Sequence, residues 1–219
     1  MAFLNLTFYQ WLMVGMGAGW IVTYLLIVFR SFKNQYCGMP FPALALNISW
    51  EFLYGFVFTE SQPFNLIRFY QAWFLLDVLI LISYILYGRK EWKLFKSNKM
   101  FYGYILLLIG ISMLLLSVLE KAIGVMAITY SAFLMNIVIS ALFIYMLKQR
   151  KNIAGQSTGI ASFKLAGSVC ATIYLLKGFG LLLQLMGVIA FILDVIYMIQ
   201  LAAAYKKEGR SLLTRKIMT

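Results

Sequence analysis

Long apolar runs alternate with short clusters of basic and small residues along the whole chain. A helix needs about 20 residues to cross the hydrocarbon core of a bilayer, and seven of the runs are of that order. They fall at residues 11–29, 41–58, 70–87, 101–119, 124–147, 161–177 and 181–205. This pattern predicts an all-α fold, a bundle of seven transmembrane helices. Lys164 and Lys177 leave only a short uncharged stretch within the sixth run, and we expect both to snorkel to the membrane interfaces.

The basic residues fall in alternate connections between these runs. Of the 19 Lys and Arg residues, 16 lie in the first, third and fifth connections or in the C-terminal tail, and 3 lie on the opposite side. Basic loops stay on the cytosolic side of a membrane. The distribution therefore predicts an N-terminus outside and a C-terminus in the cytosol.

Composition supports a membrane environment. The 219 residues are 63% hydrophobic and 12% charged, which is too little polar surface to cover a soluble domain. The net charge of +12 would suit nucleic acid if it followed one helical face, but it is divided among the connections. We expect a single integral-membrane domain over residues 1–219, in a bacterial plasma membrane or an endoplasmic reticulum, with no nucleic-acid partner.

An internal repeat emerges when the chain is shifted by 117 positions, without a gap. The shift pairs Gly38 with Gly155 and Asp77 with Asp194, and it aligns the basic clusters after the third and seventh runs. It predicts a parallel repeat of three helices, a linker helix and three helices. The repeats cover about 8–93 and 124–210, with the linker at about 101–119. The alternative is coincidence among apolar segments.

Metal-binding residue types are scarce. The chain has no histidine, and its two cysteines, Cys37 and Cys170, lie far apart. Neither a disulfide framework nor a CxxC or histidine-based metal site can be assembled from them. We therefore expect no metal and no other cofactor.

Three of the seven acidic residues lie inside apolar runs, near the middle of the predicted helices: Glu51, Asp77 and Asp194. The other four lie at helix ends or in connections. A carboxylate at the centre of a bilayer costs about 3 kcal/mol, so such groups normally face the bundle interior and carry function. We expect the three acids to line one cavity. The alternative is that they only bond neighbouring helices.

Each of these acids has polar or aromatic neighbours on its own helical face. A buried carboxyl that stays protonated beside a second carboxyl is suited to act as a general acid. Aromatic faces attract cations without supplying a nucleophile that would trap them, although Trp and Tyr are also common in membrane helices. The residues expected to bind substrate around the acids are Asn47, Trp50, Tyr54, Trp73, Asp77, Tyr84 and Tyr197.

The stretch Asn47 to Gly55, which reads Asn-Ile-Ser-Trp-Glu-Phe-Leu-Tyr-Gly, resembles a family signature, Asn-x-x-Trp-Glu-Phe. The signature belongs to small integral-membrane terpene cyclases of meroterpenoid and indole diterpenoid biosynthesis, such as those of the pyripyropene and paxilline pathways. Trp73, the Asp77 and Asp194 segments and the loop from Arg150 to Ser157 follow in the same order. The resemblance spans nearly the whole chain.

The resemblance implies a cyclisation that needs no metal. Glu51 would protonate an epoxide or alkene of a prenyl chain on a lipophilic substrate, and Asp194 would be its essential catalytic partner. The sequence has no DDxxD or DxDD cluster, which agrees with a reaction that does not ionise a diphosphate.

Two other functions also fit a seven-helix bundle. A small-solute transporter can have the same repeat, but the three prolines of this chain lie at or near predicted helix ends, where they would not break a helix for rocking motions. A retinal-type sensor would need a lysine within the last helix, and Lys177 precedes it. The transporter remains the alternative to the cyclase.

Overall fold

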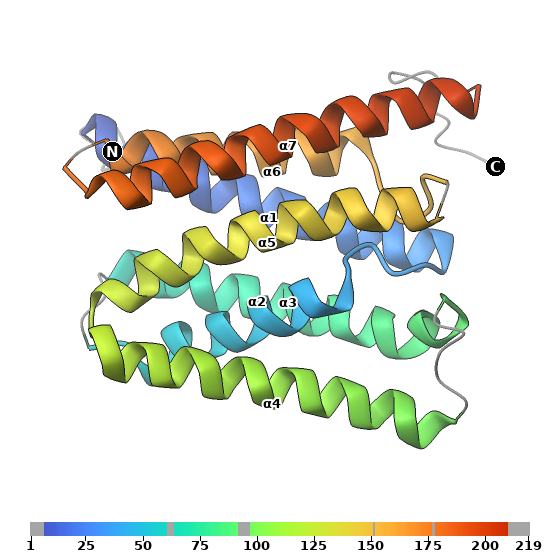
Figure 1. Cartoon of the computed structure of the whole chain (residues 1–219), viewed down its shortest axis with the longest axis horizontal. Helices are drawn as coiled ribbons and strands as arrows, with labels where there is room; N and C mark the ends of the chain where they lie inside the picture. Colours follow the sequence, from blue (N-terminus) through green and yellow to red (C-terminus); the bar gives the residue numbers. More distant parts are fainter. Residues whose placement is uncertain (1–6, 61–63, 92–96, 151, 177, 210–219) are drawn as a thin grey trace, which may run out of the picture.

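The computed structural model describes residues 7–60, 64–91, 97–150, 152–176 and 178–209. These residues form seven α-helices and no strand, which confirms the all-α prediction. The helices are α1 (Phe8–Asn34), α2 (Phe41–Phe52), α3 (Phe64–Glu91), α4 (Asn98–Ile123), α5 (Met126–Arg150), α6 (Thr158–Leu175) and α7 (Leu181–Lys207). They lie roughly along one direction, as Figure 1 shows.

Six of the helices, α1 and α3 to α7, are long and apolar enough to cross a membrane. The second predicted run, 41–58, instead forms a 12-residue α-helix followed by a five-residue π-helix over Leu53–Val57. Pro40 and Pro42 set the start of α2 because proline is favoured at the N-terminus of a helix and not inside one. The second half of the connector before α2 is buried in the bundle, with Cys37 and Met39 at 2% and 1% exposure.

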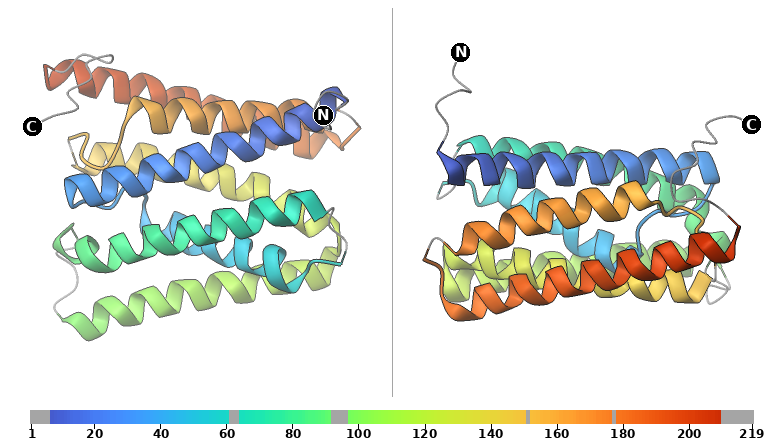
Figure 2. Two further views of the ribbon diagram at one scale, coloured as in Figure 1. Left: turned by 180° about the vertical axis from the view of Figure 1, so that it is seen from behind. Right: turned by 90° about the horizontal axis from the view of Figure 1, so that it is seen from above.

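Six helices form a closed ring in the order α1, α6, α7, α5, α2 and α3, each packed on the next. The fourth helix lies outside this ring, against α2 and α5, and Figures 1 and 2 show it at the edge of the bundle. Its outer face is apolar, with Leu106 and Leu114 more than half exposed. Such a face suits contact with lipid rather than with water.

Glycines bring α1 and α6 close together. A Cβ atom added to Gly19 would lie 3.0 Å from the backbone of Gly167, and one added to Gly15 would lie 2.9 Å from the sulfur of Cys170. Small residues allow membrane helices to pack closely. This contact fixes the position of α1 and of the side chains that it directs into the ring.

The helices alternate in direction along the chain. The α4–α5 and α6–α7 turns lie at the end of the bundle where α1 begins, and α7 ends at the opposite end. Several basic residues used to predict orientation, among them Lys93, Lys177 and Arg215, lie outside the described residues, as do the predicted repeat limits at 93 and 210.

Candidate active site

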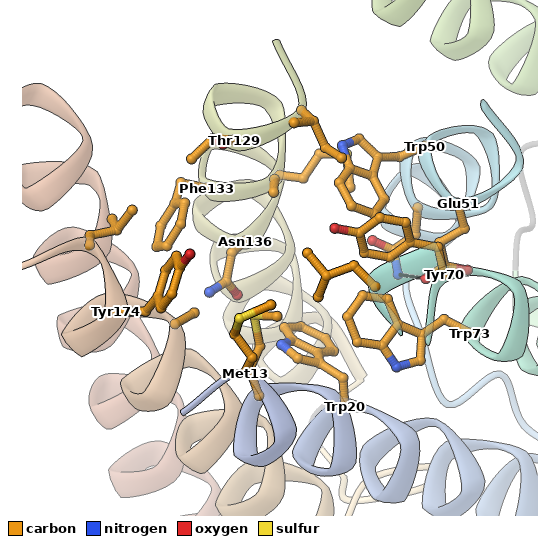
Figure 3. Close-up of a pocket in the computed structure, with 18 of the residues that line it drawn as sticks. Met13, Trp20, Trp50, Glu51, Tyr70, Trp73, Thr129, Phe133, Asn136 and Tyr174 are labelled. Carbon is orange, nitrogen blue, oxygen red and sulfur yellow. Dashed lines mark hydrogen bonds between the residues drawn. The ribbon is translucent and has the colours of Figure 1, made fainter. Parts of the chain in front are cut away.

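A cavity of about 370 Å³ lies inside the ring of helices. Its lining comes from α1, α2, α3, α5 and α6 and from the residues next to the α4–α5 and α6–α7 turns. Figure 3 shows Glu51 and Trp73 on one side, with Phe133 and Tyr174 on the other. The volume is within the range of about 300–1,000 Å³ that is usual for small-molecule pockets. The lining is mostly apolar and aromatic, which suits a lipophilic ligand.

Glu51 lies in the last turn of α2, lines the cavity and is 1% exposed. Its Oε1 accepts hydrogen bonds from the hydroxyl of Tyr24 at 2.8 Å and from Nδ2 of Asn47 at 3.4 Å, and Asn47 also donates to the Tyr24 oxygen. The helix widens into its π-helical segment two residues after Glu51. Such segments are frequent at functional sites.

Asp77 on α3 is fully buried and lies beside the side chains of Glu51 and Asn47. Among the described residues, no donor meets Oε2 of Glu51 or either carboxyl oxygen of Asp77. Buried acceptors without a donor are costly. A proton on either acid supplies the missing donor and lets the two carboxyls share a hydrogen bond, so the pair is suited to hold a transferable proton.

Aromatic rings surround the cavity side of Glu51. The Trp50 and Tyr70 ring centroids are 4.9 Å apart, and those of Tyr70 and Trp73 are 5.6 Å apart. Two indole N–H groups bond away from the cavity: Trp50 donates to the Ser131 hydroxyl at 2.8 Å and Trp73 to a backbone oxygen of α1 at 3.4 Å. These bonds fix the rings, which can then stabilise positive charge through cation–π interactions.

Asp194 lies apart from this group. It forms a buried ion pair with Lys164 and accepts a hydrogen bond from Ser140 at 2.7 Å. Among the described residues, Glu51 is the one acid that lines the cavity. The expectation that Glu51, Asp77 and Asp194 line a single cavity is therefore wrong for Asp77, which lies behind Glu51, and for Asp194, which lies on the α7 side.

The expectation that Lys164 snorkels to the interface is also wrong. Its side chain is 1% exposed and points into the bundle, because Asp194, Ser140 and Asn136 offer it acceptors there. Removing it from the cytosolic count of basic residues leaves 15 against 3.

Three tyrosines that the sequence associated with substrate are not among the residues that line the cavity. The hydroxyl of Tyr54 bonds to Glu120 at 2.9 Å, and that of Tyr197 bonds to Gln156 at 2.9 Å. Tyr84 stacks between two phenylalanines, with centroids 4.4 and 5.4 Å away. These tyrosines pack helices together. Asn47, Trp50 and Trp73, by contrast, line the cavity.

Sequence reasoning missed Tyr24, Trp20, Tyr70 and Asn136, which all line the cavity. The tyrosines and the tryptophan carried no distinguishing signal, since such residues occur throughout the apolar runs. Asn136 and Lys164 did carry one, because a polar side chain inside a membrane helix is expensive and normally has a partner. The described residues contain no group of three or more metal-ligating side chains.

A family model described as Pyr4-like transmembrane terpene cyclases matches residues 2–207. The Pyr4-family terpene cyclase mfmH of Annulohypoxylon moriforme is 30% identical over 73% of the chain, and the match covers 66% of that protein. Terpene cyclase paxB of Penicillium paxilli is 35% identical over 36% of the chain, covering 32% of that protein.

Terpene cyclase pyr4 of Aspergillus fumigatus is 25% identical over 38% of the chain, and this match covers 34% of that protein. The matched stretches thus span about a third to two thirds of these relatives' length. No solved structure matches the chain. The transporter alternative finds no support in these comparisons.

Proposed function

Since the chain belongs to the Pyr4-like transmembrane terpene cyclases, we propose that it cyclises a prenyl chain by protonating an epoxide or an alkene, without a metal. The substrate is a prenylated meroterpenoid or indole compound. The observation that carries this proposal is the position of Glu51, whose carboxyl lies at an aromatic cavity and beside a second buried acid.

Glu51 is the proton donor in this proposal because it is the acid that reaches the cavity. When its proton moves to the substrate, the remaining carboxylate keeps the hydrogen bonds of Tyr24 and Asn47. A proton on Asp77 can bond to the other oxygen. These donors stabilise a charge that exists only after the transfer. They therefore lower the free energy of the transition state more than that of the ground state.

The aromatic wall then guides the carbocation. Trp20, Trp50, Tyr70 and Trp73 present rings to the cavity, and aromatic faces stabilise a cation without bonding to it. An apolar cavity also excludes the water that would quench the cation. Loss of a proton ends the reaction, so the product is an isomer of the substrate.

The proposal includes an arrangement in the membrane. All seven helices cross or enter the bilayer, the N-terminus lies outside and the C-terminus lies in the cytosol. The basic residues support this orientation. A C-terminal reporter enzyme that is active only outside the cell would overturn it.

The parallel repeat is also part of the proposal, and the helix contacts support it. The two sets of three helices are α1 to α3 and α5 to α7, and in each set the third helix packs on the other two. The first helix of each set also packs on the second helix of the other set, α1 on α6 and α5 on α2. The 117-residue shift places Asn47 and Asp77 on Lys164 and Asp194. Asp77 lies beside Asn47, and at the equivalent positions Asp194 forms an ion pair with Lys164.

Membranes that contain the protein test the function. They are incubated with prenylated aromatic substrates that end in an epoxide or in an alkene, with and without a chelator. A product of unchanged mass and altered retention, insensitive to the chelator and absent with Glu51→Gln, is expected. Failure of the wild-type membranes to isomerise either substrate would overturn the proposal.

A further inference from the structure

Asn136 is a polar side chain on the α5 wall of the cavity. It is 8% exposed, and Figure 3 shows it on the α5 side, across from Trp73 and Glu51. A carboxamide in such an apolar lining is costly unless its hydrogen-bonding groups find partners. The surrounding residues decide which of its atoms is left for a ligand.

Lys164 fixes the orientation of this amide. Its ammonium donates to Oδ1 of Asn136 at 3.0 Å and to the Ser140 hydroxyl at 2.7 Å, and it forms the ion pair with Asp194. An ammonium has donors and no acceptor. Only the amide oxygen of Asn136 can therefore face it, which turns the amide nitrogen away.

Among the described residues, the amide nitrogen of Asn136 has one acceptor and so retains a hydrogen. Nδ2 of Asn136 donates to the hydroxyl of Ser168 at 2.9 Å, and an amide nitrogen carries two hydrogens. One hydrogen is thus used within the bundle. The other is a donor at the cavity wall.

We infer that Asn136 donates this hydrogen bond to an oxygen of the substrate, and that Lys164 and Asp194 are positioning residues that hold it in place. The inference rests on the proposed function. The accepting group is a hydroxyl, carbonyl or ether oxygen on the part of the substrate that is not cyclised, since Glu51 occupies the other side of the cavity. Asn136 thereby sets which polar group a substrate must carry.

Asp194 acts in this arrangement as the counter-charge of Lys164. The ammonium lies 5.3 Å from the ring centroid of Trp20, which lines the cavity. An unbalanced positive charge there would repel a carbocation. The ion pair keeps the amide oriented without adding net charge beside the reacting chain.

Binding of unreactive probes tests the inference apart from turnover. The probes are two aromatics whose prenyl chains are saturated and so cannot be protonated to a cation. One probe carries a hydroxyl on the part that is not cyclised, and the other lacks this hydroxyl. Asn136→Leu should weaken binding of the hydroxylated probe about two- to tenfold, the value of one neutral hydrogen bond. Binding of the deoxy probe should stay unchanged.

Two further variants complete the test. Ser83→Ala, which removes a buried hydroxyl that bonds within α3, should bind both probes as the wild type does. Lys164→Met combined with Asp194→Leu removes both charges, so it tests positioning without an unpaired charge, and it should show the same selective loss as Asn136→Leu. Equal effects on both probes, or none, would overturn the inference.

Turnover separates this result from the proposed function. Asn136→Leu should raise KM for the hydroxylated substrate while kcat stays within about threefold of the wild type, because the donor Glu51 is untouched. A wild type that binds the probes selectively yet forms no isomer would contradict the proposed function alone. A wild type that cyclises normally, with no selective loss in the variant, would contradict this inference alone.

Discussion

Gly38 and Gly155 pack backbone against backbone although 117 residues separate them. A Cβ atom on Gly155 would lie 3.2 Å from Cα of Gly38, and one on Gly38 would lie 3.1 Å from the carbonyl oxygen of Gly155. The contact joins the α1–α2 connector to the α5–α6 connector. These are equivalent places in the predicted repeat, so the two halves of the chain meet there.

Gly155→Ala should destabilise the protein. Gly155 has φ of +74°, which costs about 1 kcal/mol or more for a residue with a Cβ, and the added methyl would clash with the Cys37 carbonyl at 2.9 Å. Thermal unfolding in detergent should show a lower Tm. Gly103→Ala is the control, since its Cβ meets no atom within 4 Å and alanine favours a helix by about 1 kcal/mol. An unchanged Tm for Gly155→Ala would show that the connectors are not tightly packed.

Glu51→Gln should abolish most turnover without unfolding the protein. Glutamine keeps the shape and the hydrogen-bonding capacity of the side chain but has no transferable proton. Loss of a general acid typically lowers the rate by about 10² to 10⁴. Isomer formation, normalised to folded protein in the membrane, measures the effect. Near-normal activity would remove the general-acid mechanism.

Asp77→Asn should do less harm than Glu51→Gln. Asp77 lies behind Glu51, and the amide of asparagine can still donate to the free Glu51 oxygen. We expect kcat to fall by less than the 10² or so of a lost general acid. Single-turnover rates under saturating substrate measure this. A loss as severe as that of Glu51→Gln would make Asp77 an equal partner in proton delivery.

Tyr24→Phe should lower kcat about tenfold or more. The change removes the 2.8 Å hydrogen bond to Glu51, and hydrogen bonds to a charged group are worth about 1.5–3 kcal/mol. The lost hydrogen bond slows the proton transfer from Glu51, because this step leaves a carboxylate that Tyr24 would stabilise. Tyr145→Phe, on the exposed outer face of α5, serves as the control and should retain wild-type rates. Equal rates for both variants would contradict a role for Tyr24 in stabilising the carboxylate.

Asp194→Asn should lose activity through stability rather than through proton transfer. It leaves the buried Lys164 ammonium without its counter-charge, and breaking a buried pair costs about 3–5 kcal/mol. A lower Tm is therefore expected, in contrast to Glu51→Gln. Lys164→Met combined with Asp194→Leu should recover most of the Tm. A stable but inactive Asp194→Asn variant would instead support the role that the family resemblance implies, that of an essential catalytic partner of Glu51.

The sequence predicted the class of fold and singled out a candidate acid. Apolar runs of bilayer length identify membrane helices because the cost of an unsatisfied backbone in lipid leaves few alternatives. An acid within such a run is rare enough to indicate function by itself. Glu51 became a candidate in this way; of the two residues that the sequence places on its helical face, Asn47 lines the cavity and Tyr54 does not.

The pairing of the acids could not be predicted. Depth along a helix follows from residue number, but the direction of a side chain depends on which helices are neighbours. The sequence predicts a similar depth for Glu51, Asp77 and Asp194, yet Asp77 lies beside Glu51 and Asp194 pairs with Lys164. Lys164 near the end of an apolar run suggested a charge at the interface, whereas buried acceptors on α5 and α7 hold it inside.

The sequence by itself therefore determined that the chain is helical, that it belongs in a membrane and that Glu51 is its leading candidate for chemistry, because each of these follows from local composition and hydropathy. Only the tertiary structure decided where the cavity lies, which rings surround it, and that Tyr24 and Asn136 reach it. Those features depend on the packing of α1, α5 and α6, in which residues more than a hundred positions apart come into contact. Local sequence carries no signal for such contacts.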